Sequence, residues 1–319
     1  MMKSIDTTKE EIRNCVVAVT GSCGFLGSHM VNHLINDRNC TVIALDNLSV
    51  GKLEFLNQKA IFEWCDITGS ETTIRKIFEK YKVEYVFQYA AAPYIPVSFE
   101  RPLRVFDINA FGALKVINAA QDAGVKGILQ VSSAEIYGHV DGKIKETDEA
   151  KPHSTYGASK LAIDTLIQAR WKENKTPCIA LRLFNCVGEN DTIHPYVIPA
   201  IIEQVMKGKV VKLGNNSFRD FQYAGDAVKM AVELLEKGQY GEVYNMGSEE
   251  GIQIYDLAYM IGRLMGREIE IEVDPTRFRP WDIEHLQSDN TKLYSVIDRR
   301  PEVSLKEALI RTIKDFEVL

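Results

Sequence analysis

The fold is decided by residues 15–36, which read CVVAVTGSCGFLGSHMVNHLIN. The first six of these residues form a short apolar run that is typical of a buried strand. From Phe25 to Asn36, apolar side chains recur at helical spacing. Because glycine permits a tight turn and close packing of a helix on a strand, the stretch predicts a strand–turn–helix unit. Three glycines form the turn: Gly21, Gly24 and Gly27.

Strand-like and helix-like segments continue to alternate through the first half of the chain. Apolar runs predict further strands over 41–45, 60–64, 84–89, 127–132 and 178–183. Helical spacing predicts helices over 72–82, 102–121 and 156–174. Strands that are apolar throughout and separated by helices indicate a parallel sheet covered on both faces. The sequence therefore predicts an α/β fold with a doubly wound, parallel Rossmann-type sheet.

The glycine turn also predicts a bound dinucleotide. A helix that begins directly after such a turn offers free backbone N–H groups and a positive dipole to a diphosphate. Asp46, at the end of the second expected strand, would accept hydrogen bonds from the adenosine ribose and repel a 2′-phosphate, which favours NAD over NADP. The alternative is that Asp46 caps the turn at Asn47. Asp66, after the third expected strand, is predicted to meet the adenine amine.

Three polar residues predict oxidation chemistry. Tyr156 and Lys160 share one face of a helix because they lie four residues apart. A free tyrosine, with a pKa of about 10, is a poor base, but a nearby ammonium and a positive nicotinamide would lower that pKa. Tyr156 would then take a proton from a sugar hydroxyl. Ser133, at the end of the fifth expected strand, would hold the same hydroxyl.

Composition argues against several other classes of protein. The net charge is -6 over 319 residues, with no long run of one sign, so no nucleic-acid surface is expected. No apolar stretch is long enough to span a membrane, and the polar start of the chain does not resemble a secretion signal. The six cysteines and six histidines are scattered, which predicts buried thiols in the cytoplasm and no metal site.

The regular alternation of segments ends at Asn185. Beyond it, short segments alternate with turns, and no linker or low-complexity segment separates the two parts. We therefore expect residues 1–185 to form an NAD-binding Rossmann domain. Residues 186–319 are expected to form a smaller α/β lobe for the substrate, packed against the first domain, with some crossing of the chain between them.

The ordered motifs resemble those of the extended short-chain dehydrogenases/reductases, in the NAD-dependent nucleotide-sugar epimerase/dehydratase family. The matching pieces span nearly the whole chain. They are the glycine turn, LDNLS at 45–49, Asp66-Ile67, Ala90-Ala91 followed by Ser98 and Pro102, Asn109 with Gly112, SSAEIYG at 132–138, STYGASK at 154–160, RLFN at 182–185, VIP at 197–199, RDF at 219–221 and RPWD at 279–282.

The resemblance implies roles for individual residues, and a homodimer formed through the helices at 102–121 and 156–174. The implied cofactor site comprises Gly21, Gly24, Phe25, Leu26, Gly27, Asp46, Asn47, Asp66, Ile67, Ala90, Ala91, Ala92, Asn109, Tyr156 and Lys160. The implied partner is a nucleotide-diphosphate sugar carrying UDP, GDP or dTDP. Its implied site comprises Asn185, Tyr196, Val197, Arg219, Arg279 and Asp282, and Tyr94 either touches the sugar or packs.

Enzymes of this kind oxidise the sugar, usually at C4, and the product then depends on few residues. Glu135 occupies the position where dehydratases and related decarboxylases carry glutamate, and it would remove the C5 proton; the alternative is a solvated loop carboxylate. Ala134 cannot donate a proton, and alanine at this position is more typical of an epimerase. We favour a 4,6-dehydratase. The alternatives, in order, are a 4-epimerase and then a C4 dehydrogenase or a decarboxylase. A non-enzymatic NAD-binding scaffold is disfavoured because Ser133, Tyr156 and Lys160 are all present.

Overall fold

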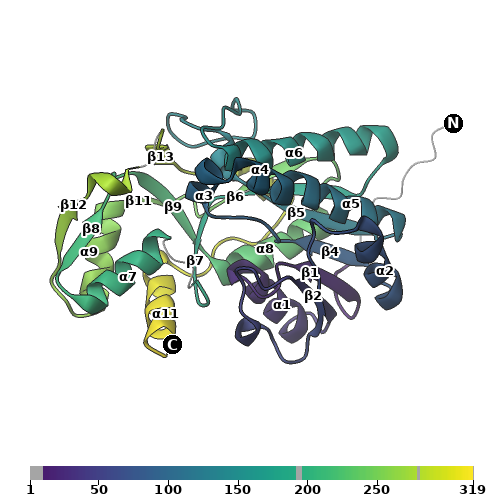
Figure 1. The fold of residues 1–319 in the computed structure, drawn as a ribbon, viewed down its shortest axis with the longest axis horizontal. Coiled ribbons are helices and arrows are strands. Elements are labelled where there is room, and N and C mark those ends of the chain that lie inside the picture. Colours follow the sequence, from purple (N-terminus) through teal and green to yellow (C-terminus); the bar gives the residue numbers. More distant parts are fainter. Residues whose placement is uncertain (1–9, 192–195, 279–280, 319) are drawn as a thin grey trace.

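The computed structural model describes residues 10–191, 196–278 and 281–318. Its largest element is a parallel sheet of seven strands (Figure 1), which confirms the predicted fold class. The strand order is β10-β6-β5-β4-β1-β2-β3, so the chain starts at the centre and extends the sheet in both directions. The strands are β1 Val16–Thr20, β2 Thr41–Asp46, β3 Ile61–Trp64, β4 Tyr85–Gln88, β5 Gly127–Ser133, β6 Cys178–Leu183 and β10 Val243–Met246.

Helices cover both faces of this sheet. Alternate residues of β1 face opposite sides: Val17 and Val19 pack with α1 (Phe25–Asn36) and α8 (Ala224–Lys237), whereas Ala18 faces the other helices. Those helices are α2 (Glu71–Tyr81), α5 (Ala113–Asp122) and α6 (Thr155–Asn174). Two apolar faces buried in this way explain why the strands are predominantly apolar.

The helix expected over 102–121 is interrupted. It consists of α4 (Pro102–Phe106), a π-helical segment over Asp107–Gly112, and α5. In the interruption Asn109 turns inward, where its side chain accepts a hydrogen bond from the Ala92 N–H at 2.7 Å and donates one to the Ala92 carbonyl at 3.2 Å. The wider helical turn therefore accompanies a contact between helix and loop that sequence periodicity does not reveal.

The second half of the chain contributes to both parts of the molecule. Strand β10 joins the large sheet beside β6, and α8 packs against α1, so the chain returns to the first part after residue 185. The smaller lobe lies at the left in Figure 1. Its strands are β7 Asn185–Val187, β8 Val210–Leu213, β9 Phe218–Tyr223, β11 Gly251–Gln253, β12 Glu270–Val273 and β13 His285–Leu286.

Helices α7 (Val197–Lys207), α9 (Ile254–Leu264) and α11 (Leu305–Val318) build the core of the small lobe against these strands. The remaining short elements are α3 Ile95–Glu100, α10 Thr291–Tyr294, and 3-10 turns at Leu53–Phe55, Ala134–Ile136 and Pro275–Arg277. Within the described ranges, every helix is too short or too polar to traverse a bilayer.

A buried polar network ties α6 to the sheet. The Arg182 guanidinium on β6 donates from Nε to Asp164 of α6 at 2.9 Å, and from Nη1 to the Tyr137 hydroxyl at 2.7 Å. Tyr137 in turn donates to Asn245 of β10 at 2.7 Å. Asp164 is fully buried, so its charge depends on Arg182 for compensation.

We expect Asp164→Ala to destabilise the protein by about 3–5 kcal/mol, because it leaves the Arg182 charge buried without its partner. The free energy of unfolding in urea, followed by circular dichroism, measures this cost. The control is Glu307→Ala, which breaks an exposed pair with Arg311 and should cost less than about 0.5 kcal/mol. Equal losses of unfolding free energy in the two variants would contradict the larger contribution expected from the buried pair.

Candidate active site

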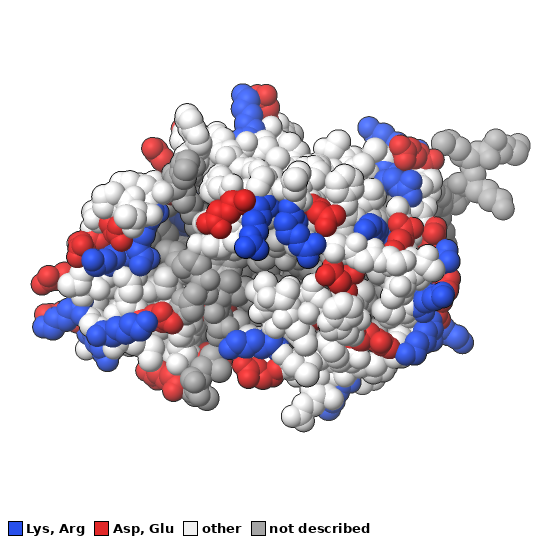
Figure 2. Space-filling model, viewed as in Figure 1, with Lys and Arg blue, Asp and Glu red and all other residues white. Residues whose placement is uncertain are grey.

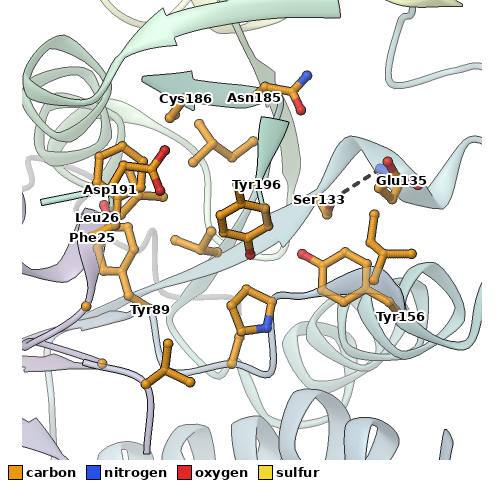
Figure 3. A pocket seen from close by; sticks show the side chains of 18 of the residues that line it. Phe25, Leu26, Tyr89, Ser133, Glu135, Tyr156, Asn185, Cys186, Asp191 and Tyr196 are labelled. Carbon is orange, nitrogen blue, oxygen red and sulfur yellow. Dashed lines mark hydrogen bonds between the residues drawn. The ribbon is translucent and has the colours of Figure 1, made fainter. Parts of the chain in front are cut away.

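A cavity of about 450 Å³ opens between the large sheet and the small lobe. It lies at the carboxyl ends of the strands, where ligands bind in open α/β sheets. Figure 3 shows Ser133, Glu135 and Tyr156 at one end and Phe25, Leu26 and Asp191 at the other. The predicted residues that line the cavity are Gly21, Gly24, Phe25, Leu26, Gly27, Asp46, Asn47, Asp66, Ile67, Ala90, Ala91, Ser133, Glu135, Tyr156, Lys160, Asn185, Tyr196, Val197, Arg219 and Asp282.

The glycine turn is packed too closely for side chains. Gly21 adopts a φ of +65°, and a Cβ there would lie 2.7 Å from the Ala90 nitrogen. A Cβ at Gly27 would lie 1.9 Å from the Gly21 carbonyl oxygen. The turn therefore holds the start of α1 against the end of β1, with the N-terminal residues of α1 facing the cavity. This arrangement fits a dinucleotide diphosphate, because the helix N-terminus presents N–H groups and a positive dipole.

Two carboxylates extend the site along the edge of the sheet. Asp46 accepts hydrogen bonds from the N–H groups of Cys23 at 2.9 Å and Leu48 at 2.8 Å. It therefore caps its own turn, and the ribose contact predicted for it would use its remaining acceptor capacity. Burial would raise the pKa of Asp66, but hydrogen bonds from Thr68 and Asn47 hold that pKa below its usual value. Asp66 is thus an anionic acceptor at neutral pH.

The structure brings Ser133, Tyr156 and Lys160 together. Ser133 lies close enough to the Tyr156 hydroxyl to act on its pKa, and the Lys160 ammonium lies 5.9 Å from the centre of the Tyr156 ring. Lys160 also donates to the Val131 carbonyl at 2.9 Å, which fixes its position beneath the cavity. These contacts place three groups that can hold and move one hydroxyl proton around a single point.

Burial changes the pKa values of this group in a direction that the sequence did not predict. It raises the pKa of Tyr156 to about 12 and lowers that of Lys160 to about 8. The hydrogen bond from Ser133 opposes the shift of Tyr156, and the charge of Glu135 adds to it. The lowering expected from a neighbouring ammonium is therefore outweighed in the protein alone, because desolvation disfavours both charged forms.

Glu135 lies within the cavity wall. Its backbone N–H donates to the Ser133 hydroxyl oxygen at 3.2 Å, which caps the 3-10 turn that carries it (Figure 3). The side chain is partly buried, and its charge acts on Tyr156. A carboxylate at this place is a pocket residue, in contrast to the solvated loop carboxylate considered as an alternative.

Three predicted residues that the structure describes, Ala92, Tyr94 and Asn109, do not line the cavity. Asn109 lies behind the wall, where it fixes the backbone of Ala92 and hydrogen-bonds Ser159. Tyr94 packs edge-on against Tyr196, with ring centres 6.0 Å apart. Arg279 lies outside the described residues. The contacts with cofactor or substrate that were predicted for Ala92, Asn109, Tyr94 and Arg279 therefore remain predictions.

In the small lobe, Arg219 is held by an ion pair. Its Nη2 atom lies 3.2 Å from Asp282, and Nη1 donates to the Phe218 carbonyl. Arg277, which the sequence analysis did not single out, also lines the cavity and pairs with Asp274 at 3.5 Å. Two guanidinium groups on one wall can bind a diphosphate. Asn185 donates to the Asp220 carbonyl at 3.2 Å, which holds it at the opening of β7.

Two further features bear on what the site can hold. The described residues bring together no set of His, Cys, Asp and Glu side chains that would bind a metal ion. Figure 2 shows acidic and basic side chains mixed over the visible face, without a large area of one sign. Polar contacts with a ligand would therefore come from side chains at the edge of the large sheet and in the small lobe.

Residues 17–247 match the sequence profile of the NAD dependent epimerase/dehydratase family. The chain belongs to this family. The match confirms the predicted family, its NAD cofactor and its enzymatic nature. The sequence features that predicted NAD, the glycine turn and Asp46, lie within the matched residues.

Relatives in this family include enzymes of two activities. The chain is 30% identical to human dTDP-D-glucose 4,6-dehydratase over 316 residues, covering 93% of this chain and 89% of the relative. It is 27% identical to UDP-glucose 4-epimerase of Streptococcus mutans over 315 residues, covering 92% and 94%. The crystal structure of UDP-glucose 4-epimerase from Thermotoga maritima with UDP-glucose superposes with a TM-score of 0.89 at 30% identity, covering 95% of this chain and 99% of that one.

We expect Gly27→Ala to abolish NAD binding, because its Cβ would overlap the Gly21 carbonyl and displace the start of α1. Isothermal titration calorimetry with NAD measures the loss, and circular dichroism verifies folding. The control is Gly208→Ala, since a Cβ there would meet no atom within 4 Å. Undiminished NAD affinity in a folded Gly27→Ala protein would show that the diphosphate does not depend on this close approach.

Proposed function

We propose that the protein is a nucleotide-sugar 4,6-dehydratase, which oxidises the sugar at C4, eliminates water across C5 and C6, and reduces C6. The observation that carries this proposal is the position of Glu135. It lines the same cavity as Ser133 and Tyr156 and is close enough for its charge to act on the Tyr156 hydroxyl. A second acid–base group beside the oxidising pair is what elimination requires and epimerisation does not.

Each residue moves or holds a proton at a defined place. Tyr156 takes the proton of the C4 hydroxyl, and Ser133 holds the same oxygen by a hydrogen bond. Glu135 then takes the C5 proton, which is acidic beside the C4 ketone, and delivers it to the C6 hydroxyl as water leaves. The proton held by Tyr156 finally returns to C5, so both residues regain their starting forms.

Bound NAD would supply the hydride acceptor for the oxidation at C4 and the hydride donor for the reduction at C6. The residues that would hold it are the glycine turn, the first residues of α1, and Asp46, Asp66 and Lys160, all of which line the cavity. Because Gly21 and Gly27 have no side chains, a diphosphate can approach the backbone of the turn and the helix N-terminus closely.

The small lobe would hold the nucleotide diphosphate of the substrate. Arg219 and Arg277 supply positive charge, and Asn185 and Tyr196 line the same cavity. Asp282 would approach the nucleotide ribose while it orients Arg219. UDP, GDP and dTDP share the diphosphate and a pentose that these groups would recognise, although the pentose of dTDP lacks the 2′-hydroxyl. The dehydratase relative supports a dTDP-sugar, and the epimerase relatives support a UDP-sugar.

A nucleotide-sugar 4-epimerase is the second candidate, and Ala134 favours it. Ala134 is 1% exposed and lines the cavity next to Glu135, where it offers no proton donor for the departing hydroxyl. An epimerase would use the same Ser133, Tyr156 and Lys160 and would need only space for the keto-sugar to rotate. In that case Glu135 would have no chemical step to perform.

We expect Glu135→Gln to abolish water loss from the sugar while the first oxidation continues. Mass spectrometry of UDP-, GDP- and dTDP-hexoses after incubation distinguishes the products, since only a dehydratase product has lost one water. In the matched variant Tyr156→Phe, oxidation itself should fall by roughly 10³-fold or more, with NAD still bound. Unimpaired interconversion of C4 epimers by Glu135→Gln, with no change of mass, would establish the epimerase instead.

We also propose a homodimer formed through α4 and α6. Three large apolar side chains on neighbouring segments of this region are exposed: Leu103 by 86%, Phe111 by 57% and Phe99 by 43%. Helices α4 and α6 pack against each other, so these side chains belong to one helical layer. An apolar surface of this kind is typical of an interface between subunits.

We expect Leu103→Glu to convert the dimer into a monomer at micromolar concentration, because the interface would bury an unpaired charge. Light scattering coupled to size-exclusion chromatography gives the mass directly. Val273→Glu places the same charge on the exposed strand β12 of the small lobe and should leave the mass unchanged. A dimer that persists in Leu103→Glu but dissociates in Val273→Glu would move the interface to the small lobe.

We further propose that the protein functions in the cytoplasm. All six cysteines are free thiols, and four of them are buried. A reducing compartment is where such thiols persist.

A further inference from the structure

Asp191 is a buried carboxyl in the cavity that the proposed chemistry does not use. It follows Gly188 in the loop after β7, is 4% exposed, and lines the same cavity as the catalytic residues. Its Oδ1 atom has no hydrogen-bond partner among the described residues. Figure 3 shows its side chain beside Phe25 and Leu26, at the end of the cavity opposite Tyr156.

The preceding residues fix Asp191 in this place. The Asn190 N–H donates to Asp315 of α11 at 2.7 Å, and its side chain donates to the Ser28 hydroxyl of α1 at 3.1 Å. The carbonyl of Glu189 is hydrogen-bonded to His29 of α1 at 2.9 Å. These contacts tie the loop to both lobes, so the Asp191 carboxyl is directed into the cavity.

Among the described residues, no positively charged side chain acts on the Asp191 carboxyl. Cys186 on β7 interacts with the charge of Asp191, and Tyr89 after β4 interacts with Cys186. The loop that carries Asp191 also contains Glu189 and contacts His29 on α1 and Asp315 on α11. Burial lowers the pKa of His29 and raises those of Cys186 and Tyr89, so all three are neutral at pH 7. Burial alone raises the pKa of Asp191 to about 8.

We propose that Asp191 contacts the bridging diphosphate of bound NAD as a neutral carboxylic acid, donating a hydrogen bond to a diphosphate oxygen. Phe25 and Leu26 begin α1, where a diphosphate binds through the helix N-terminus, and Asp191 lies beside them. An ionised carboxylate here would repel the diphosphate, whereas the acid supplies a donor that complements it. The inference rests on the NAD cofactor of the family and is independent of which reaction follows.

NAD affinity should therefore depend on pH through Asp191. The group must carry a proton to bind, so affinity is full below its pKa and falls as pH rises above about 8. Calorimetric titration of the full-length protein with NAD should show affinity falling about tenfold between pH 7 and pH 9. Asp191→Asn keeps a hydrogen-bond donor without the charge, so its affinity should equal that of wild type at pH 7 and exceed it at pH 9.

Lys160, with a pKa of about 8, titrates in the same range, but it does so in both proteins. The difference between the wild-type and Asp191→Asn curves therefore isolates Asp191. At pH 8.5, titrations in two buffers of different ionisation enthalpy should show that wild type takes up more protons on binding than Asp191→Asn. Asp191→Ala, which has no donor, should bind roughly three- to tenfold more weakly than wild type at pH 7.

Asp315→Asn is the structural control, because its amide oxygen can still accept the Asn190 N–H and the change removes a charge near the loop without altering Asp191 itself. It should retain the wild-type pH dependence. Parallel curves for wild type and Asp191→Asn would overturn the proposal, as would weaker binding by Asp191→Asn than by Asp191→Ala. Failure of the wild-type protein to bind NAD at any pH would overturn the cofactor assignment, and this proposal with it.

Discussion

The contact between Gly27 and the Gly21 carbonyl is the constraint on which the rest of the site depends. With a side chain at Gly27, α1 would have to move away from the end of β1. The helix N-terminus would then no longer face the edge where β2, β4, β5 and β6 also end. Because parallel strands bring their carboxyl ends to one edge, this single approach places a diphosphate site beside the catalytic residues of β5 and α6.

Around this edge the protein buries several ionisable groups that it does not itself neutralise. Tyr156, Lys160 and Asp191 all have pKa values shifted toward the uncharged form, and burial is the largest cause in each case. Their charges are therefore governed by what enters the cavity. A cationic nicotinamide favours the tyrosinate, whereas a diphosphate favours protonated Asp191. Burial therefore has the same effect on the groups near the nicotinamide and near the diphosphate, although these two parts of the cofactor carry opposite charges.

The sequence predicted most of the sheet because both faces of most strands are buried, which leaves runs of apolar residues that are easily recognised. It did not predict the π-helical segment at Asp107–Gly112, because the inward turn of Asn109 accompanies hydrogen bonds to a loop residue distant in the chain. Strand β10 joins a sheet that begins more than two hundred residues earlier, and no local pattern marks that pairing.

The same distinction applies to the site. Ser133, Tyr156 and Lys160 stand in motifs with fixed spacing, so their convergence was predictable. Asp191 is a single acidic residue in a polar loop, and only the tertiary contacts of Asn190 direct it into the cavity. Arg277 lies two residues before the arginine that the motif indicated, and its place on the wall depends on how the segment folds back toward Gly214.

The structure also explains how one scaffold serves epimerases and dehydratases. The backbone of Glu135 is held tightly: a Cβ at Gly157 would lie 2.6 Å from its carbonyl oxygen, and its N–H is bound by Ser133. These contacts involve main-chain atoms of Glu135, so they would remain with another side chain at this position. In the proposed function, oxidation depends on the buried Lys160 and Tyr156, whereas the second step depends on the side chain at position 135. A change of product therefore requires no change in the fold.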